Sequence, residues 1–208
     1  EFHDALFILI ELRDFHEICM TFFNIAVNAW LAFEHKRAAL YIDRCLTLMK
    51  AAGLSNLSYH SMHGILSVAG LCAVEDGNFA RAYQYLARID TEGLQPYPAK
   101  NEEFFSHNLL LAKLRYHEND TKGATLAFAT AHEYLMKTND NIQYFAPRFH
   151  YETCLFGKLS GSNEEYSTAL SAGETVSAER KNRFYQSIFT KIRKTGAVTA
   201  TGAGIEDI

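Results

Sequence analysis

The sequence predicts an all-α protein. Apolar residues recur at three- and four-residue spacing along almost all of its 208 residues, as between Phe15 and Leu31, which is typical of one helix face. Helix breakers are few, with 3 Pro and 12 Gly, and no segment shows the alternation of a strand. Hydrophobic residues at 48% and charged residues at 21% indicate an ordinary globular core, which excludes a disordered tail or a miniprotein.

Short polar breaks divide the apolar stripes into successive helices. The breaks lie near residues 34–35, 53–56, 75–78, 91–100, 118–121, 138–141 and 159–163. They predict helices over 4–33, with a break near Asp14 left open, 36–52, 57–76, 79–90, 101–118, 121–137, 142–159, 164–177 and 179–194.

Local signals place some of the helix ends. Asn101 and Asn163 each precede two glutamates, so both are predicted at helix starts. Because proline is tolerated only in the first turn of a helix, the segment that contains Pro147 either begins near Ala146 or kinks there. We predict one helical domain over 1–194, followed by a flexible C-terminal tail over 195–208.

A helix-turn-helix unit is visible between Leu66 and Leu86. Gly70 is small enough to let a second helix approach, and Gly77-Asn78 has the composition of a turn. Phe79 is expected to fill the helix pair, and Ala82 to pack closely against the first helix.

Weaker copies of this unit repeat along the chain. The small residues of the second helices are Ala38, Ala82, Ala124 and Ala169, at spacings of 44, 42 and 45 residues. The matching positions of the first helices hold Ala26, Gly70, Ala112 and Gly157. Four registered pairs of small residues indicate an array of helical hairpins.

The unit resembles a tetratricopeptide repeat (TPR). Its period is longer than the roughly 34 residues of a regular TPR and nearer the roughly 40–47 of other helical-hairpin arrays, so the chain resembles a degenerate TPR-like α-solenoid. It is also similar to the helical-repeat arm of PCI-type complex subunits and to the superhelical sensor region of large bacterial transcription activators. The resemblance implies a right-handed superhelix of antiparallel helix pairs with a C-terminal capping helix.

In a TPR-like array the first helices line the concave surface, so the resemblance nominates binding residues there. These are Ser67, Leu71, Glu75, Lys113, Tyr116, His117, Tyr151 and Lys158.

The last predicted helix is strongly basic. From Arg180 to Lys194 it carries no acid but six bases, Arg180, Lys181, Arg183, Lys191, Arg193 and Lys194. The rest of the chain therefore has a net charge of -10 against -4 overall. Phe184, Ile188, Phe189 and Ile192 share one side at helical spacing. One interpretation is a docking helix for an acidic partner, a phosphate or a membrane surface; the other is a capping helix that buries this stripe.

Cysteine spacing and net charge narrow the cellular compartment and the class of ligand. Cys19, Cys45, Cys72 and Cys154 are widely spaced in apolar runs, which favours free thiols in the cytoplasm, with the nucleus as the alternative. No apolar run is long enough for a membrane span. The small negative net charge argues against nucleic acid as the main ligand.

Catalytic and cofactor motifs are absent. His60 and His63 stand three apart, but nothing in the sequence fixes a third zinc ligand, so no metal site is predicted. No Gly-rich phosphate loop and no GxSxG nucleophile elbow occurs, so we expect no cofactor and no enzyme.

The sequence therefore predicts a non-catalytic scaffold or adaptor for a protein or peptide partner, within a larger protein or a multisubunit complex. Two alternatives stay open. One is a ligand- or peptide-sensing domain of a larger transcription regulator, which would bring Glu75, Lys113 and His117 together. The other is a metal-dependent or other hydrolase.

Overall fold

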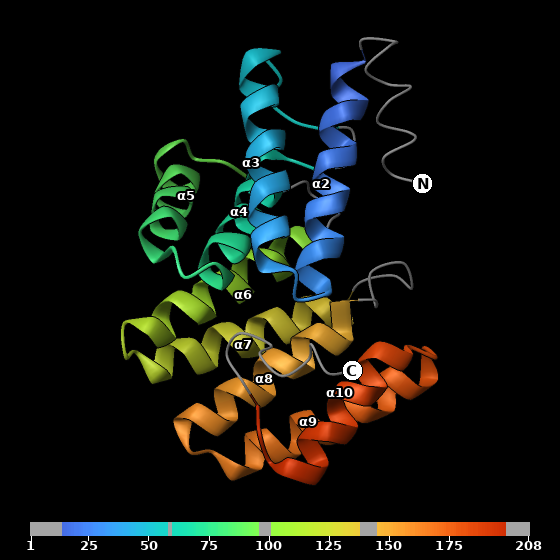
Figure 1. The fold of residues 1–208 in the computed structure, drawn as a ribbon. Coiled ribbons are helices and arrows are strands. Elements are labelled where there is room, and N and C mark those ends of the chain that lie inside the picture. The colour runs from blue at the N-terminus through green and yellow to red at the C-terminus, as the bar shows by residue number, and fades with distance from the viewer. Residues whose placement is uncertain (1–13, 58–59, 96–100, 138–144, 199–208) are drawn as a thin grey trace. The chain divides into compact units, whose positions relative to one another are not determined.

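A computed structural model describes residues 14–57, 60–95, 101–137 and 145–198 (Figure 1). Over these ranges the regular structure is helix, apart from an isolated antiparallel bridge between Leu57 and His60. The all-α prediction is thereby confirmed for the described residues. The chain divides into two compact units, Glu1–Tyr134 and Leu135–Ile208, and each is described by itself.

The first unit is built around one buried helix. Its helices are α2 (Phe15–Leu31), α3 (His35–Ala51), α4 (Met62–Glu75), α5 (Phe79–Thr91), α6 (Asn101–His117) and α7 (Thr121–Met136), the last of which ends just past the unit boundary. Every residue of α4 from His63 to Val74 is buried, because α2, α3, α5 and α6 all pack against it. Figure 1 shows α2 and α3 lying side by side along most of their length.

The turns of this unit share one conformation. Phe33, Gly77 and Asn119 have φ angles of 62°, 75° and 63°, in the left-handed region. The residue after each then donates its N–H to the carbonyl five residues back, as Asn78 does to Ala73 at 2.8 Å. This Schellman-type turn satisfies carbonyl groups at the end of each helix.

Polar side chains begin the helices that follow. Asn78 Oδ1 accepts the N–H of Arg81 at 3.2 Å, and Asp120 Oδ1 accepts the N–H of Gly123 at 2.9 Å. These bonds satisfy donors that have no partner within the helix. The Gly77-Asn78 turn predicted from sequence is therefore present, with a distinct role for each residue.

Two predicted helix starts in the first unit differ from the observed ones. One is wrong, and the other lies outside the described residues. The helix predicted over 57–76 begins at Met62, because Leu57 and His60 bond to each other's backbone and Ser61 caps the helix instead. Of the helix predicted over 4–33, residues 4–13 lie outside the described residues; α2 begins at Phe15, after the N-cap Asp14.

The second unit contains α8 (Ala146–Ser160), α9 (Asn163–Glu179) and α10 (Arg183–Thr195), with α9 packed against both of the others. The helix start near Ala146 is confirmed, and Pro147 lies in the first turn of α8. Residues 142–144 of the predicted 142–159 helix, and 199–208 of the predicted tail, lie outside the described residues. The domain boundary at 194 stays a prediction.

Three further predicted helix starts, those of α9, α10 and α6, can be compared with the structure. Ser162, and not Asn163, caps α9 by accepting the N–H of Glu165 at 3.3 Å. The last helix begins at Arg183 instead of 179, because α9 continues to Glu179 and the chain then turns through Lys181 at φ 52°. Asn101 is the first residue of α6.

All eight small residues that align between the predicted helical hairpins are buried. They are Ala26, Ala38, Gly70, Ala82, Ala112, Ala124, Gly157 and Ala169. The neighbour of Gly70 differs from the expectation, since a Cβ there would collide with Leu110 of α6 and not with α5. At Gly157 a Cβ would lie 2.6 Å from the backbone nitrogen of Tyr166, so α9 starts directly against this glycine.

Replacing Gly157 with alanine tests this contact. The colliding atoms belong to backbone, which cannot rotate away, so Gly157→Ala is expected to lower the free energy of unfolding by about 2 to 3 kcal/mol. The matched control is Gly77→Ala, which has nothing within 4 Å but has φ +75°, and should cost about 1 kcal/mol of backbone strain. Urea unfolding followed by circular dichroism measures both, and equal losses would contradict the proposed steric cause.

Candidate functional site

The C-terminal end of α4 carries a buried ion pair. Glu75 closes α4, and its carboxylate pairs with Lys113 of α6; the two side chains are only 3% and 12% exposed. His35, the first residue of α3, places Nδ1 3.6 Å from the same carboxylate. Two residues nominated for the concave face, Glu75 and Lys113, are therefore brought together and bind each other.

A carboxylate of α6 binds at the N-terminal end of α4. Glu103, 2% exposed, accepts the backbone N–H of Ser61 at 2.7 Å and the Ser61 hydroxyl as well. Gly64 makes room for this carboxyl group, since a Cβ there would lie 2.7 Å from Glu103 Cγ. Sequence reasoning noticed Glu103 only as an acid near the start of its own helix and missed this contact.

At this same end of α4, two imidazole rings lie against each other. The ring centroids of His63 and His107 are 4.7 Å apart, and the Nδ1 atom of each is buried without a hydrogen-bond partner. Burial lowers the pKa of His63, and burial together with His63 lowers the pKa of His107 to about 4. Both rings are therefore neutral at pH 7.

The pair of histidines considered from sequence does not form. His60 precedes α4 and lies against Phe23, with ring centroids 4.5 Å apart, whereas His63 faces His107. Among the described residues, no three His, Cys, Asp or Glu side chains are grouped so that they could hold a metal ion.

Contacts between α4 and α6 keep a nearly constant sequence offset. The pairs are His63–His107, Gly64–Glu103, Gly70–Leu110 and Glu75–Lys113, with offsets of 44, 39, 40 and 38 residues. Because Glu103 near the start of α6 contacts Gly64 near the start of α4, and Lys113 near the end of α6 contacts Glu75 at the end of α4, the two helices run in the same direction.

The other residues nominated for the concave face are either buried in the core or accessible at the surface. Ser67, Leu71 and Tyr151 are at most 3% exposed and belong to the core. His117 is exposed, but its ring stacks on that of Phe79, with the ring centroids 3.7 Å apart. Tyr116 is half-buried. Lys158 is exposed, with Nζ 5.5 Å from the ring centroid of Tyr166. Tyr116, His117 and Lys158 are thus the nominated side chains that a partner could reach most directly.

In the second unit, α10 has one buried and one exposed face. Tyr185, Ile188, Phe189 and Ile192 are 0–3% exposed and form the buried stripe. Phe184, assigned to this stripe from the sequence, is 36% exposed, and Tyr185 takes its place. The capping interpretation thus agrees with the burial of the stripe.

Side-chain bonds fix α10 to α9. Arg193 makes two bonds to Glu174 of α9, at 2.7 Å and 2.5 Å, and these bonds lower the pKa of Glu174. Gln186 Nε2 donates to the Ser177 carbonyl at 2.9 Å. Of the six basic residues predicted for this helix, Arg180 and Lys181 lie in the preceding turn instead.

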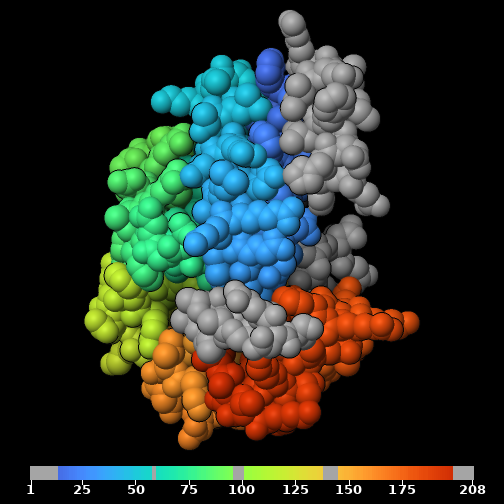
Figure 2. Space-filling model, in the orientation of Figure 1, coloured from blue at the N-terminus to red at the C-terminus, as the bar shows by residue number. Residues whose placement is uncertain are grey.

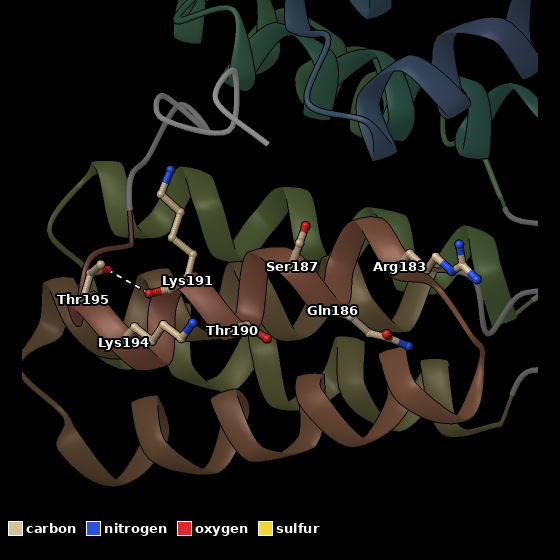
Figure 3. Close-up of a pocket in the computed structure, with 7 residues that line it drawn as sticks. All are labelled: Arg183, Gln186, Ser187, Thr190, Lys191, Lys194 and Thr195. Carbon is tan, nitrogen blue, oxygen red and sulfur yellow. Dashed lines mark hydrogen bonds between the residues drawn. The ribbon is translucent and has the colours of Figure 1, made fainter.

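An open hollow lies along the exposed face of α10. The described residues that line it all belong to this helix: Arg183, Gln186, Ser187, Thr190, Lys191, Lys194 and Thr195 (Figure 3). In Figure 2, atoms at the red end of the colour scale, where α10 lies, reach the molecular surface.

Comparison with protein-family models, with curated proteins and with solved structures finds no match. In the described parts of the chain, no helix is both long and apolar enough to cross a membrane.

The neutral histidine pair predicts a pH-dependent stability. The folded-state pKa of His107, about 4, lies below its ordinary value of 6.5, so the unfolded chain binds more protons between these values. Stability is therefore full above pH 6.5 and falls as the pH drops to 4, by up to about 3 kcal/mol at about 1.4 kcal/mol per pH unit.

Urea unfolding at pH 7 and pH 4.5 checks this expectation in the wild type and in His107→Leu. The variant should lose much of the difference between the two pH values, while His132→Leu, at an exposed position, should keep it. An unchanged pH difference in His107→Leu would refute the assignment.

The Glu75–Lys113 pair predicts energetic coupling. Lys113→Met and Glu75→Gln each leave a buried charge poorly matched, whereas the double variant removes both charges. A double-mutant cycle should give a coupling energy of about 2 kcal/mol. The exposed Glu34–Arg37 pair is the control and should give less than about 1 kcal/mol.

Proposed function

We propose that this chain is a non-catalytic scaffold or adaptor that binds protein or peptide partners, as part of a larger protein or a multisubunit complex. In this proposal it is a TPR-like, right-handed superhelix of antiparallel helix pairs, and α10 caps one end. Such arrays present side chains of successive helices on a continuous surface.

The observation that carries the proposal is the sequence offset of the contacts between α4 and α6. Its range of 38–44 residues overlaps the 42–45 spacing of the small residues in the sequence. Asp43 of α3 and Arg81 of α5, also 38 residues apart, bond at 2.6 Å and 2.8 Å. Both observations are expected if α4 and α6 are the first helices, and α3 and α5 the second helices, of neighbouring repeats.

The turns support antiparallel pairing within each repeat. Helices α2 and α3 pack together and are joined by a turn of only three residues, as are α4 and α5. Neighbouring helices with so short a connection are expected to reverse direction.

Several observations favour a non-catalytic role. The buried ionic groups Glu75, Lys113 and Glu103 are already engaged with other groups of the chain. Burial raises the pKa of the Cys154 thiol to about 12, so this thiol is not an activated nucleophile at neutral pH. The four cysteines are free and buried, in keeping with a reducing compartment, the cytoplasm or alternatively the nucleus.

The alternative of a ligand-sensing domain draws on the same polar cluster. Glu75 and Lys113 do converge, but each neutralises the other, and a ligand would have to displace this pair. We therefore prefer the scaffold.

Affinity capture with the purified domain tests the proposal. We expect a protein partner that binds again, at a defined stoichiometry, when both components are purified. Tyr116→Ala, His117→Ala and Lys158→Ala together should weaken capture if the partner uses the predicted concave face, with exposed Lys122→Ala as the control. Failure to recover any protein above a tag-only control would contradict the scaffold proposal.

A further inference from the structure

Three sulfur atoms meet in the core between α2 and α3. Cys19 of α2 and Cys45 and Met49 of α3 are 0%, 0% and 1% exposed. Cys45 Sγ lies 3.8 Å from Met49 Sδ, and Cys19 Sγ lies 3.9 Å from the backbone oxygen of Cys45. The side chains of Cys19 and Cys45 also interact with each other. The fold therefore gathers two thiols and one thioether in one small region of the core.

Helix geometry explains this grouping. Cys45 and Met49 are one turn apart, so both lie on the same face of α3. The contact of Cys19 with Cys45 shows that this face is turned towards α2, which packs along α3 (Figure 1). Cys19 and Cys45 are 26 residues apart in the chain, so sequence spacing does not reveal the group.

The separation of the sulfur atoms suits ligands of one metal ion. A metal–sulfur bond is about 2.3 Å long, so two sulfur ligands of the same ion lie about 4 Å apart. The sulfur atoms of Cys45 and Met49 already have this separation, at 3.8 Å. An ion can therefore bind both without moving them apart.

The type of ligand selects the ion. Thiolate and thioether sulfur are soft ligands, and soft ligands favour Cu(I). A structural Zn²⁺ site takes four ligands, mostly Cys and His, and within the described ranges no three His, Cys, Asp or Glu side chains are grouped to hold a metal. Mg²⁺ and Ca²⁺ are bound by oxygen. Two thiols and one thioether therefore match Cu(I) best.

We propose that Cys19, Cys45 and Met49 form a binding site for one Cu(I) ion, with both cysteines bound as thiolates and Met49 as a thioether. The two thiol protons pass to solvent when the ion binds. Copper stays in the Cu(I) state, so the step consumes no oxidant or reductant. The bound ion links α2 to α3. This inference goes beyond the scaffold function and is independent of it.

A competition for Cu(I) tests the site. Metal-free protein, kept reduced and anaerobic, is mixed with Cu(I) and the coloured chelator bathocuproine disulfonate. Because the three sulfur atoms are closed to solvent, Cu(I) is offered both to the folded protein and during refolding from urea. The wild type is expected to take one Cu(I) per chain from the chelator. No uptake under either condition would overturn the inference.

Cysteine substitutions locate the bound ion. The variant with Cys19→Ala and Cys45→Ala should lose this uptake. The matched control, Cys72→Ala with Cys154→Ala, removes the other two buried cysteines and should keep it. Uptake that persists in the first variant, or that is lost equally in both, would indicate an adventitious ion only and would overturn the site.

Met49→Leu tests the thioether in a variant of nearly unchanged volume, which is expected to fold even if the cysteine variants do not. It should weaken Cu(I) binding about tenfold, measured as the chelator concentration that removes half of the ion, with unchanged helix content by circular dichroism. Unchanged affinity would rule out the three-sulfur site.

X-ray absorption by the bound copper identifies its ligands directly. Three sulfur neighbours at about 2.3 Å are expected in the wild type. Nitrogen or oxygen neighbours in their place would show that the ion binds elsewhere and would refute the assignment to Cys19, Cys45 and Met49.

Discussion

Complete burial of α4 is the constraint on which the first unit depends. A helix packed against α2, α3, α5 and α6 gains apolar contacts on several sides. Helix α6 contacts α4 near both of its ends, with Glu103 bonded to Ser61 before its start and Lys113 paired with Glu75 at its last residue. These two contacts fix the direction and the register of α6, and the repeat offset follows from them.

Much of the fold could be predicted from the sequence because helix stripes and small-residue contacts are local patterns with a fixed period. Gly70 and Gly157 were identified by spacing alone, and both are buried at close contacts. The neighbour of Gly70 was assigned to the wrong helix, because spacing shows that a position is crowded but not which element crowds it.

Competing local signals limited how accurately the helix ends could be predicted. Ser162 and Asn163 are both good caps, and the choice between them depends on where the left-handed Gly161 ends α8. Tyr185 and Phe184 compete in the same way for the buried side of α10, and in the structure Tyr185 is the buried one. The Glu75–Lys113 pair was nominated as two separate surface residues, because first-helix positions point toward the neighbouring repeat as well as toward a groove.

The shared direction of α4 and α6 has an electrostatic consequence. Parallel neighbouring helices bring like ends of their macrodipoles together, which is unfavourable unless charged groups compensate. Glu103 lies at the positive ends and Lys113 near the negative ends, so α6 carries both compensating charges. Glu75 alone would add negative charge at the negative end of α4. Its pairing with Lys113 cancels that charge, so the pair adds no net negative charge where the two negative helix ends lie side by side.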